Sequence, residues 1–223
     1  MTVQATPYVA YPRPDVAEKL RLPPGRLRIL DAAAEAFMER GYDSTSIDEI
    51  ADRIGATKGA VYYNYRSKLD IFLAVYERGM LLLEERTADA LQKCADATSA
   101  ERLRAVSVAH ADNIMSNYTY HVVIQSGVEQ RRQMALKDAD RTRLSELDQM
   151  RTHHESLIQA FIDEGQRDGS IRDMPARLAT RTLIGGIVGI AIWYRPRTGQ
   201  TQDERLDMAG EVVELLLTGL LPR

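Results

Sequence analysis

The sequence predicts an all-α protein, and three observations support this fold class. Apolar residues recur at intervals of three and four from Arg26 onward, which is typical of amphipathic helices. After Ser67 no segment alternates apolar and polar residues as a half-buried strand would. Polar or Gly/Pro segments near residues 96–99, 169–173 and 196–199 interrupt the pattern, so several separate helices are expected.

The first 25 residues are rich in proline, which cannot continue a helix because it lacks an amide hydrogen. The prolines are Pro7, Pro12, Pro14, Pro23 and Pro24. We expect residues 1–25 to form a flexible, extended N-terminal arm. From Arg26 the pattern changes, and Leu27, Leu30, Ala34 and Phe37 predict an amphipathic helix that ends at Gly41.

A short helix is predicted to begin at Ile47. Ser46 and Glu49 have the spacing of a capping box, in which a hydroxyl and a carboxylate each accept a free amide hydrogen at the helix start. Gly55 can adopt the positive φ that ends such a helix. One face of the helix is apolar and consists of Ile47, Ile50, Ala51 and Ile54.

A second short helix follows after a tight turn. Thr57 is a suitable N-cap for residues 58–63, and Ser67 and Asp70 predict the start of a third helix directly after it. Ala51, Gly55 and Val61 occupy the small, turn and apolar positions of a helix-turn-helix. Residues 44–68 therefore predict a unit that presents the second helix to the major groove of DNA.

The charges in this region favour contact with phosphates. Lys58, Arg66 and Lys68 are the only charged residues between Thr57 and Leu69, and all three are cationic. We expect Tyr65 to be a core residue, whereas Tyr62 and Tyr63 cannot both be buried on a two-turn helix. The predicted DNA-binding residues are Thr45, Ser46, Thr57, Lys58, Gly59, Ala60, Tyr62, Tyr63 and Lys68.

These residues resemble the signature of the tetracycline-repressor (TetR) family of regulators. The matching residues are Phe37, Gly41, Thr45, Ser46, Ile50, Ala51, Gly55, Tyr62, Tyr63, Tyr65 and Lys68. Tyr65 and Asn64 depart from the usual Phe and His. The resemblance implies a three-helix DNA-binding domain, residues 26–70, and a helical effector-binding and dimerisation domain, residues 71–223. It also implies a homodimer that binds a palindromic DNA operator.

Arg13, Lys19 and Arg21 in the arm offer a further contact with DNA. By analogy with other helical readers, such basic residues can reach a minor groove or the backbone. The alternative is a disordered tail without contacts.

Six helices are predicted for the remainder of the chain. Within the fifth, the apolar stretch Leu183–Trp193 has eleven residues and is too short to cross a bilayer, so we expect a buried helix and no membrane contact. The predicted ranges are 68–93, 100–116, 120–137, 141–168, 175–194 and 201–221.

Three glycines in the fifth of these helices weaken it and must permit a close approach. Pairing it with the leucine-rich last helix and their symmetry mates would form a four-helix dimer interface. Packing within one chain accounts for part of the apolar surface of these two helices. The predicted interface residues are Gly185, Gly189, Met208, Val212, Leu216 and Leu220.

The middle helices are expected to hold an effector pocket, as the family resemblance implies. The segment Ala191–Pro196, followed by Gly199, resembles a subgroup that controls lipid or steroid breakdown, some of whose members sense acyl-CoA thioesters. The runner-up effector is an apolar drug-like or aromatic compound. Cations for CoA phosphates would be Arg131, Arg132, Arg141, Arg143, Arg151 and Arg195, although surface salt bridges explain these residues equally well. The predicted pocket residues are Met115, Tyr118, Val122, Gln125, Phe161, Ile187, Ile190 and Trp193.

Enzymatic and metal-binding functions find no support in the sequence. Adjacent His153 and His154 point to different sides of a helix and cannot hold one metal together, so we interpret them as solvated. No nucleophile or nucleotide-binding motif is present, and no cofactor is expected. A single cysteine, Cys94, excludes an intramolecular disulfide and agrees with a reducing cytoplasm, as does the lack of a signal-peptide pattern.

Three hypotheses from different classes remain. The first is an inducible repressor, with an efflux-gene repressor as its variant. The second is a constitutive DNA-packaging protein, although the net charge of −3 restricts any attraction for DNA to a local patch. The third is a helical ligand carrier without a regulatory role.

Overall fold

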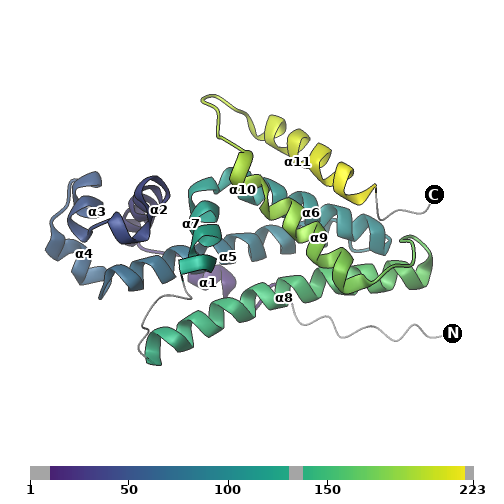
Figure 1. The fold of residues 1–223 in the computed structure, drawn as a ribbon, viewed down its shortest axis with the longest axis horizontal. Coiled ribbons are helices and arrows are strands. Elements are labelled where there is room, and N and C mark those ends of the chain that lie inside the picture. The colour runs from purple at the N-terminus through teal and green to yellow at the C-terminus, as the bar shows by residue number, and fades with distance from the viewer. Residues whose placement is uncertain (1–10, 131–137, 219–223) are drawn as a thin grey trace. The chain divides into compact units, whose positions relative to one another are not determined.

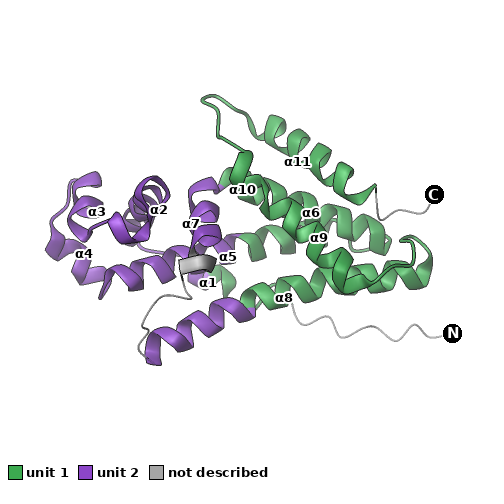
Figure 2. Cartoon of the chain, in the orientation of Figure 1, with its two compact units in different colours: residues 1–17, 83–116, 150–223 green, residues 18–82, 117–149 purple. Residues whose placement is uncertain are grey.

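The computed structural model describes residues 11–130 and 138–218, and this part of the chain is all-helical (Figure 1). The chain divides into two compact units (Figure 2). Unit 2 comprises residues 18–82 and 117–149, and unit 1 comprises residues 1–17, 83–116 and 150–223. The division falls within helices α1, α5 and α8, so each of these contributes residues to both units.

The helices follow one another with short connections. They are α1 (Val16–Leu20), α2 (Pro24–Ser44), α3 (Ile47–Arg53), α4 (Lys58–Asn64), α5 (Lys68–Lys93), α6 (Ser99–Ser116), α7 (Tyr118–Gln130), α8 (Asp138–Asp168), α9 (Ala176–Val188), α10 (Ile190–Trp193) and α11 (Gln202–Leu217). The predicted all-α class is confirmed.

Side-chain caps explain where the short helices of unit 2 begin. The Ser46 hydroxyl accepts a hydrogen bond from the Glu49 amide at 3.1 Å, and Thr57 accepts one from Ala60 at 3.2 Å. The capping box at α3 is only half formed, because the Glu49 carboxylate instead pairs with Arg40 and Arg53, both at 3.3 Å. Two guanidinium groups attract the carboxylate more strongly than a single amide does.

A core of small and aromatic side chains joins the helices of unit 2. Ala33, Ala34 and Ala36 on α2 are fully buried, which lets α2 approach α3 and α7 closely. Gly41 interrupts α2 as predicted. It adopts the non-helical φ of 78°, and beyond this kink a short helical turn continues to Ser44.

The proline-rich segment is not an extended arm over the residues that are described. Residues 16–20 form α1, and the side chain of Val16 is 2 % exposed. Arg13 donates to the buried Glu84 through its backbone amide at 2.6 Å and forms an ion pair with it at 3.0 Å. The Arg13 side chain is therefore bound within unit 1, against the prediction that it reaches DNA, and Lys19 lies 3.9 Å from Glu77. Residues 1–10 lie outside the described part.

Unit 1 packs α6 against α9, α10 and α11. The glycine-permitted approach predicted for α9 occurs within the chain: a Cβ atom on Gly186 would lie 2.6 Å from Cδ2 of Leu216 on α11. The Asp112 carboxylate, 1 % exposed, lies between Arg86 of α5 at 3.0 Å and Arg205 of α11 at 3.5 Å. This buried ion triad connects three helices.

The apolar helix predicted for residues 175–194 is broken and only partly buried. Gly189 separates α9 from α10, and a Cβ atom at this position would lie 3.2 Å from the Gly186 carbonyl oxygen. By length and composition alone, Ala176–Trp193 could cross a membrane, with a mean hydropathy of 1.3. A third of these residues are buried, and α9 packs on α6 and α11, so the expected buried helix is buried only along part of its surface.

Candidate functional site

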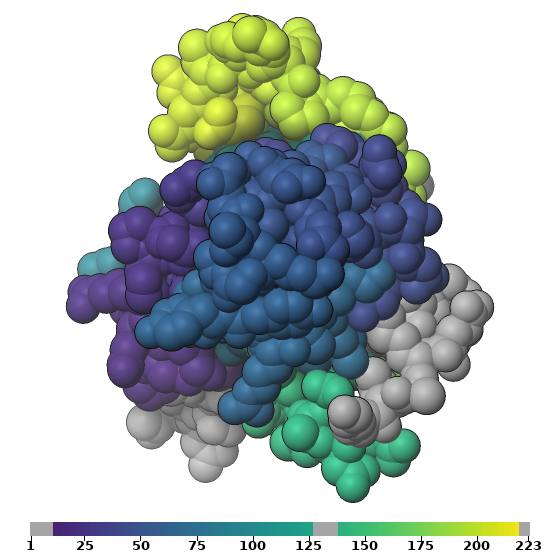
Figure 3. Space-filling view, turned by 90° about the vertical axis from the view of Figure 1, so that its left-hand side faces the viewer, coloured from purple at the N-terminus to yellow at the C-terminus, as the bar shows by residue number. Residues whose placement is uncertain are grey.

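The outer surface of α3 and α4 forms the first candidate site, and Figure 3 looks onto this end of unit 2. The Tyr62 side chain is 47 % exposed and Tyr63 is 91 % exposed. The other predicted contact residues at this surface, Ser46, Thr57, Lys58, Gly59 and Ala60, are also exposed. We call these seven residues the α4 face.

The three tyrosines of the motif separate as predicted. Tyr65 is 2 % exposed, and the guanidinium carbon of Arg26 lies 4.9 Å from the centroid of its ring. Burial raises the pKa of the Tyr65 phenol. Tyr65 therefore seats the start of α5 in the core, whereas Tyr62 and Tyr63 remain available to a ligand.

Lys68 is bound within the chain instead of facing outward. Its ammonium donates to the backbone oxygens of Tyr42 at 2.7 Å, Asp43 at 3.1 Å and Thr45 at 2.8 Å. It also lies 4.5 Å from the centroid of the Tyr42 ring. An ammonium has three hydrogens, so this arrangement leaves none for a phosphate. We correct the predicted phosphate contact to a positioning role.

Thr45 also turns inward, against the prediction that it contacts DNA. The residue is 2 % exposed, and its hydroxyl lies 3.1 Å from the Ala36 oxygen and 2.8 Å from the Gly41 oxygen. With Lys68, Thr45 stabilises the connection between α2 and α3. Neither hydroxyl nor ammonium was recognisable as inward-facing from the sequence, because the carbonyls they bind lie up to 26 residues away.

Ion pairs hold α3 onto α2. Arg53 pairs with Glu39, with Glu49 at 3.3 Å and with Glu35 at 3.9 Å, and it keeps the pKa of Glu39 below its usual value. Arg28 donates to the Ile54 carbonyl at 2.7 Å. These contacts hold α3, and with it the α4 face, in a fixed position on α2.

Lys58 is the predicted cation of the α4 face, and it forms a 2.6 Å ion pair with Asp48. Both side chains are more than half exposed. Such surface pairs contribute roughly 0–1 kcal/mol. A phosphate could therefore replace Asp48 as the partner of Lys58 at low cost.

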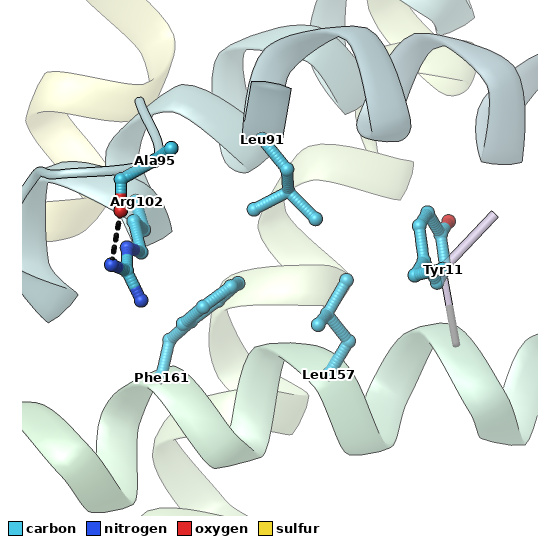
Figure 4. Close-up of a pocket in the computed structure, with 6 residues that line it drawn as sticks. All are labelled: Tyr11, Leu91, Ala95, Arg102, Leu157 and Phe161. Atoms are coloured by element: carbon cyan, nitrogen blue, oxygen red, sulfur yellow. Dashed lines mark hydrogen bonds between the residues drawn. The ribbon is translucent and has the colours of Figure 1, made fainter. Parts of the chain in front are cut away.

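A second candidate site is a partly open cavity of about 230 Å³ in unit 1 (Figure 4). Its lining comes from residues far apart in the sequence, namely Tyr11, Leu91, Ala95, Arg102, Leu157 and Phe161. Figure 4 shows Leu91, Leu157 and Phe161 between Arg102 on one side and Tyr11 on the other.

Of the eight predicted pocket residues, only Phe161 lines this cavity. Met115, Ile187 and Ile190 are buried in unit 1, and Trp193 is 54 % exposed. Tyr118, Val122 and Gln125 belong to α7 in unit 2. Spacing offered one missed signal, since Leu157 and Phe161 lie four residues apart on α8. No sequence signal placed Tyr11 here.

Hydrogen bonds and stacking hold Tyr11 at the edge of the cavity. Its ring stacks on His153 with centroids 5.2 Å apart, and its hydroxyl lies 3.4 Å from Nδ1 of His154. His154 Nε2 in turn lies 3.2 Å from Nδ1 of His110. Burial raises the pKa of Tyr11 and lowers the pKa of His154 to about 4, so both are neutral at pH 7. His154 is 4 % exposed, so interpreting it as solvated was wrong.

The arginines considered for CoA phosphates are largely engaged. Arg143 pairs with Asp70 and, at 3.2 Å, with Glu77, and Arg195 donates to the carbonyls of Ile192 and Tyr194. Arg131 and Arg132 lie outside the described residues.

Exposed apolar side chains on α9, α10 and α11 are the third candidate site. They are Leu178, Ile192, Trp193, Leu206 and Leu215, and we refer to these five side chains together as the apolar face. Of the predicted dimer residues, Gly185 is exposed, Gly189, Met208 and Val212 are half-buried, and Leu216 packs on Gly186. Leu220 lies outside the described residues. Leu178 and Leu206 were not recognised from the sequence as interface candidates, because helical periodicity does not tell which side of a helix a neighbouring helix covers.

Two family descriptions match most of the chain. Residues 29–75 match "Bacterial regulatory proteins, tetR family", and residues 96–220, more than half of the chain, match "Tetracyclin repressor-like, C-terminal domain".

Three curated relatives are similar over most of their length. The fatty acid metabolism regulator protein of Bacillus subtilis (strain 168) is 23 % identical, covering 88 % of this chain and 96 % of the relative. The transcriptional activator FasR of Mycolicibacterium smegmatis (strain ATCC 700084 / mc(2)155) is 30 % identical, covering 75 % and 68 %. The transcriptional repressor KstR2 of Rhodococcus jostii (strain RHA1) is 28 % identical, covering 87 % and 90 %.

Solved structures share the fold. The ketosteroid transcriptional regulator KstR2 of Mycobacterium tuberculosis has a TM-score of 0.77 at 21 % identity, covering 91 % of this chain and 98 % of that chain. AibR in complex with isovaleryl coenzyme A and operator DNA has a TM-score of 0.65 at 24 % identity, covering 84 % and 97 %.

The roles of Lys58 and Lys68 can be separated by the salt dependence of DNA binding. Lys58→Met should reduce the slope of log K against log salt by about one per protomer while the melting temperature stays unchanged. Lys68→Met should lower the free energy of unfolding by about 1–3 kcal/mol, because three carbonyls lose a charged donor. Its salt slope should equal that of the wild type. If Lys68→Met also reduced the salt slope, Lys68 would contact a phosphate after all and the correction made above would be wrong.

The tyrosines provide a matched pair of substitutions. Tyr65→Ala should destabilise the protein by about 3 kcal/mol or more, since it empties a buried site. Tyr63→Ala should change stability by less than about 0.5 kcal/mol, because the side chain is exposed. Chemical denaturation measures both, and equal losses would contradict the placement of these side chains.

Proposed function

The chain belongs to the TetR family of bacterial transcriptional regulators, and from this premise we propose that it is an effector-released repressor. In the proposed mechanism a homodimer binds a palindromic operator in double-stranded DNA, and a small-molecule effector releases it. The observation that carries the proposal is the α4 face, where two tyrosines and a weakly paired lysine are exposed on a rigid support. Operator DNA lies in the bacterial cytoplasm, so we expect the protein to act there.

The chemistry of the α4 face supports contact with both backbone and bases. Lys58 can exchange Asp48 for a phosphate, and the Tyr62 and Tyr63 hydroxyls can donate to phosphate oxygens. The small residues Gly59 and Ala60 leave the first turn of α4 free of bulky side chains, which favours a close approach to base edges.

Dimerisation is supported by the apolar face. Leu215 is 80 % exposed and Ile192 is 65 % exposed, and large apolar side chains left in water are candidates for protein–protein contacts. A two-turn helix reads only a few base pairs, so two copies are needed to select one site in a genome.

The cavity and the names of the relatives support an acyl compound as the effector. One curated relative is a regulator of fatty acid metabolism, and a fold neighbour is a ketosteroid regulator. A cavity of about 230 Å³ is below the roughly 300–1,000 Å³ of drug-sized pockets, so it could hold the acyl part of an acyl-CoA but not its nucleotide. An aromatic effector is the alternative, favoured by the Tyr11 and Phe161 rings in the lining.

Release requires that the effector prefer one conformation of the dimer. An effector that binds the DNA-incompatible arrangement more tightly lowers operator affinity by the ratio of its two affinities. Typical couplings of 1–3 kcal/mol correspond to about 5–150-fold.

A mobility-shift assay on the DNA flanking its own gene tests the function. The purified protein should shift one palindromic fragment at physiological salt, and octanoyl-CoA, or an aromatic acid in the alternative, should abolish the shift. Tyr62→Ala combined with Tyr63→Ala should weaken the shift at least tenfold with the fold intact. Sequence-independent binding without release would indicate DNA packaging, and ligand binding without any shift would indicate a carrier.

The oligomeric state tests the apolar face. Leu215→Glu should convert the dimer to a monomer in light scattering, because two charges would be buried at a symmetric contact. Operator affinity should then fall by more than about 100-fold. Ser156→Glu, an exposed position on α8 outside the apolar face, serves as the control. A Leu215→Glu protein that remains dimeric would exclude the apolar face as the dimer interface.

A further inference from the structure

Arg102 is the one residue of the cavity lining with a cationic side chain, and it lacks an acidic partner among the described residues. Its Nη2 donates to the Ala95 carbonyl at 2.5 Å (Figure 4). Its Nε is buried and has no hydrogen-bond acceptor in the described part of the chain. A buried donor without an acceptor costs free energy, so this position favours a ligand that supplies one.

Three other arginines of unit 1 are paired with carboxylates. Arg13 pairs with Glu84 at 3.0 Å, Arg86 with Asp112 at 3.0 Å, and Arg104 with Glu214. The acidic neighbour of Arg102 is also engaged, because the Glu101 carboxylate accepts hydrogen bonds from the Thr98 amide at 2.7 Å and hydroxyl at 2.8 Å. Arg102 is thus a cation whose counter-charge is missing at the edge of a cavity.

The remainder of the lining is suited to an apolar body. Leu91, Leu157 and Phe161 lie between Arg102 and the ring of Tyr11 (Figure 4). At roughly 30 Å³ per water-sized group, 230 Å³ encloses about eight non-hydrogen atoms. Because the cavity is partly open, a ligand of about eight to ten such atoms fits with its end at the opening. The cavity therefore combines one fixed cation, a short apolar path and an aromatic end.

We propose that this cavity binds a small amphipathic monocarboxylate, a free carboxylic acid of about six to eight carbons. The carboxylate accepts hydrogen bonds from Nε and from the remaining hydrogen of Nη2, which is the side-on geometry that arginine offers to planar anions. The hydrocarbon part packs between Leu91, Leu157 and Phe161. The inference deepens the proposed function by naming the effector class, and it rests on that function only for the consequence at the operator.

The charge distinguishes a free acid from a thioester. A thioester carbonyl is neutral, so its hydrogen bond to Arg102 gains nothing from an opposite charge, whereas a carboxylate supplies the missing counter-charge. A thioester must also lead its CoA moiety out of a cavity that holds about eight atoms. Free acid should therefore bind more tightly than the alcohol of equal length and no more weakly than the CoA thioester.

Calorimetric titration of the full-length protein with octanoate, octan-1-ol and octanoyl-CoA tests the proposal directly. Octanoate should bind the wild type at least tenfold more tightly than octan-1-ol. Arg102→Met should abolish that preference, and Arg102→Lys should keep part of it because the charge remains. Arg104→Met removes a cation from the same helix outside the cavity and should bind octanoate like the wild type.

Two results would overturn the site. One is equal binding of octanoate and octan-1-ol by the wild type, and the other is unchanged octanoate affinity in a folded Arg102→Met protein, with folding checked by circular dichroism. Binding is measured without DNA, so it separates this proposal from the proposed function. Octanoate that binds through Arg102 and leaves the operator complex intact would confirm the site and contradict effector release.

Discussion

The ammonium of Lys68 is the interaction on which the DNA-facing part of the molecule depends. It binds the carbonyl groups of Tyr42, Asp43 and Thr45 at the end of α2 and the entry to α3, where a helix terminus leaves oxygens without intrahelical partners. A cation at a helix C-terminus is also favoured by the helix dipole. One side chain on α5 thereby determines the path of the chain into α3.

Ring contacts reinforce the same junction. Phe37, Tyr42 and Phe72 lie with ring centroids 5.1–5.8 Å apart, and the Lys68 ammonium lies over the Tyr42 ring. Salt bridges from Arg53 then hold α3 to α2. The α4 face can remain exposed because the residues beneath it supply the stability. Because these contacts fix the shape of the α4 face, an effector would change its position and not its shape.

Several buried polar groups connect the segments of unit 1. Asp112 connects two arginines, Glu84 binds the N-terminal segment, and Tyr11, His154 and His110 lie in one line of close contacts. Burial keeps His154 neutral at physiological pH, so this side chain adds no charge beside the cavity. Arg102 stands apart from this pattern of matched groups.

The sequence by itself determined the fold class and the helix starts that follow the N-caps Ser46, Thr57 and Ser67. It also distinguished the buried Tyr65 from the exposed Tyr63. Caps and helical periodicity act over three or four residues, so local sequence carries them. Only the tertiary structure decided that Lys68 and Thr45 face inward, that Tyr11 and Arg102 line one cavity, and that Leu215 and Ile192 remain uncovered. Those outcomes depend on carbonyls, rings and helices distant in the chain, and a side chain's spacing does not reveal which distant partner will reach it.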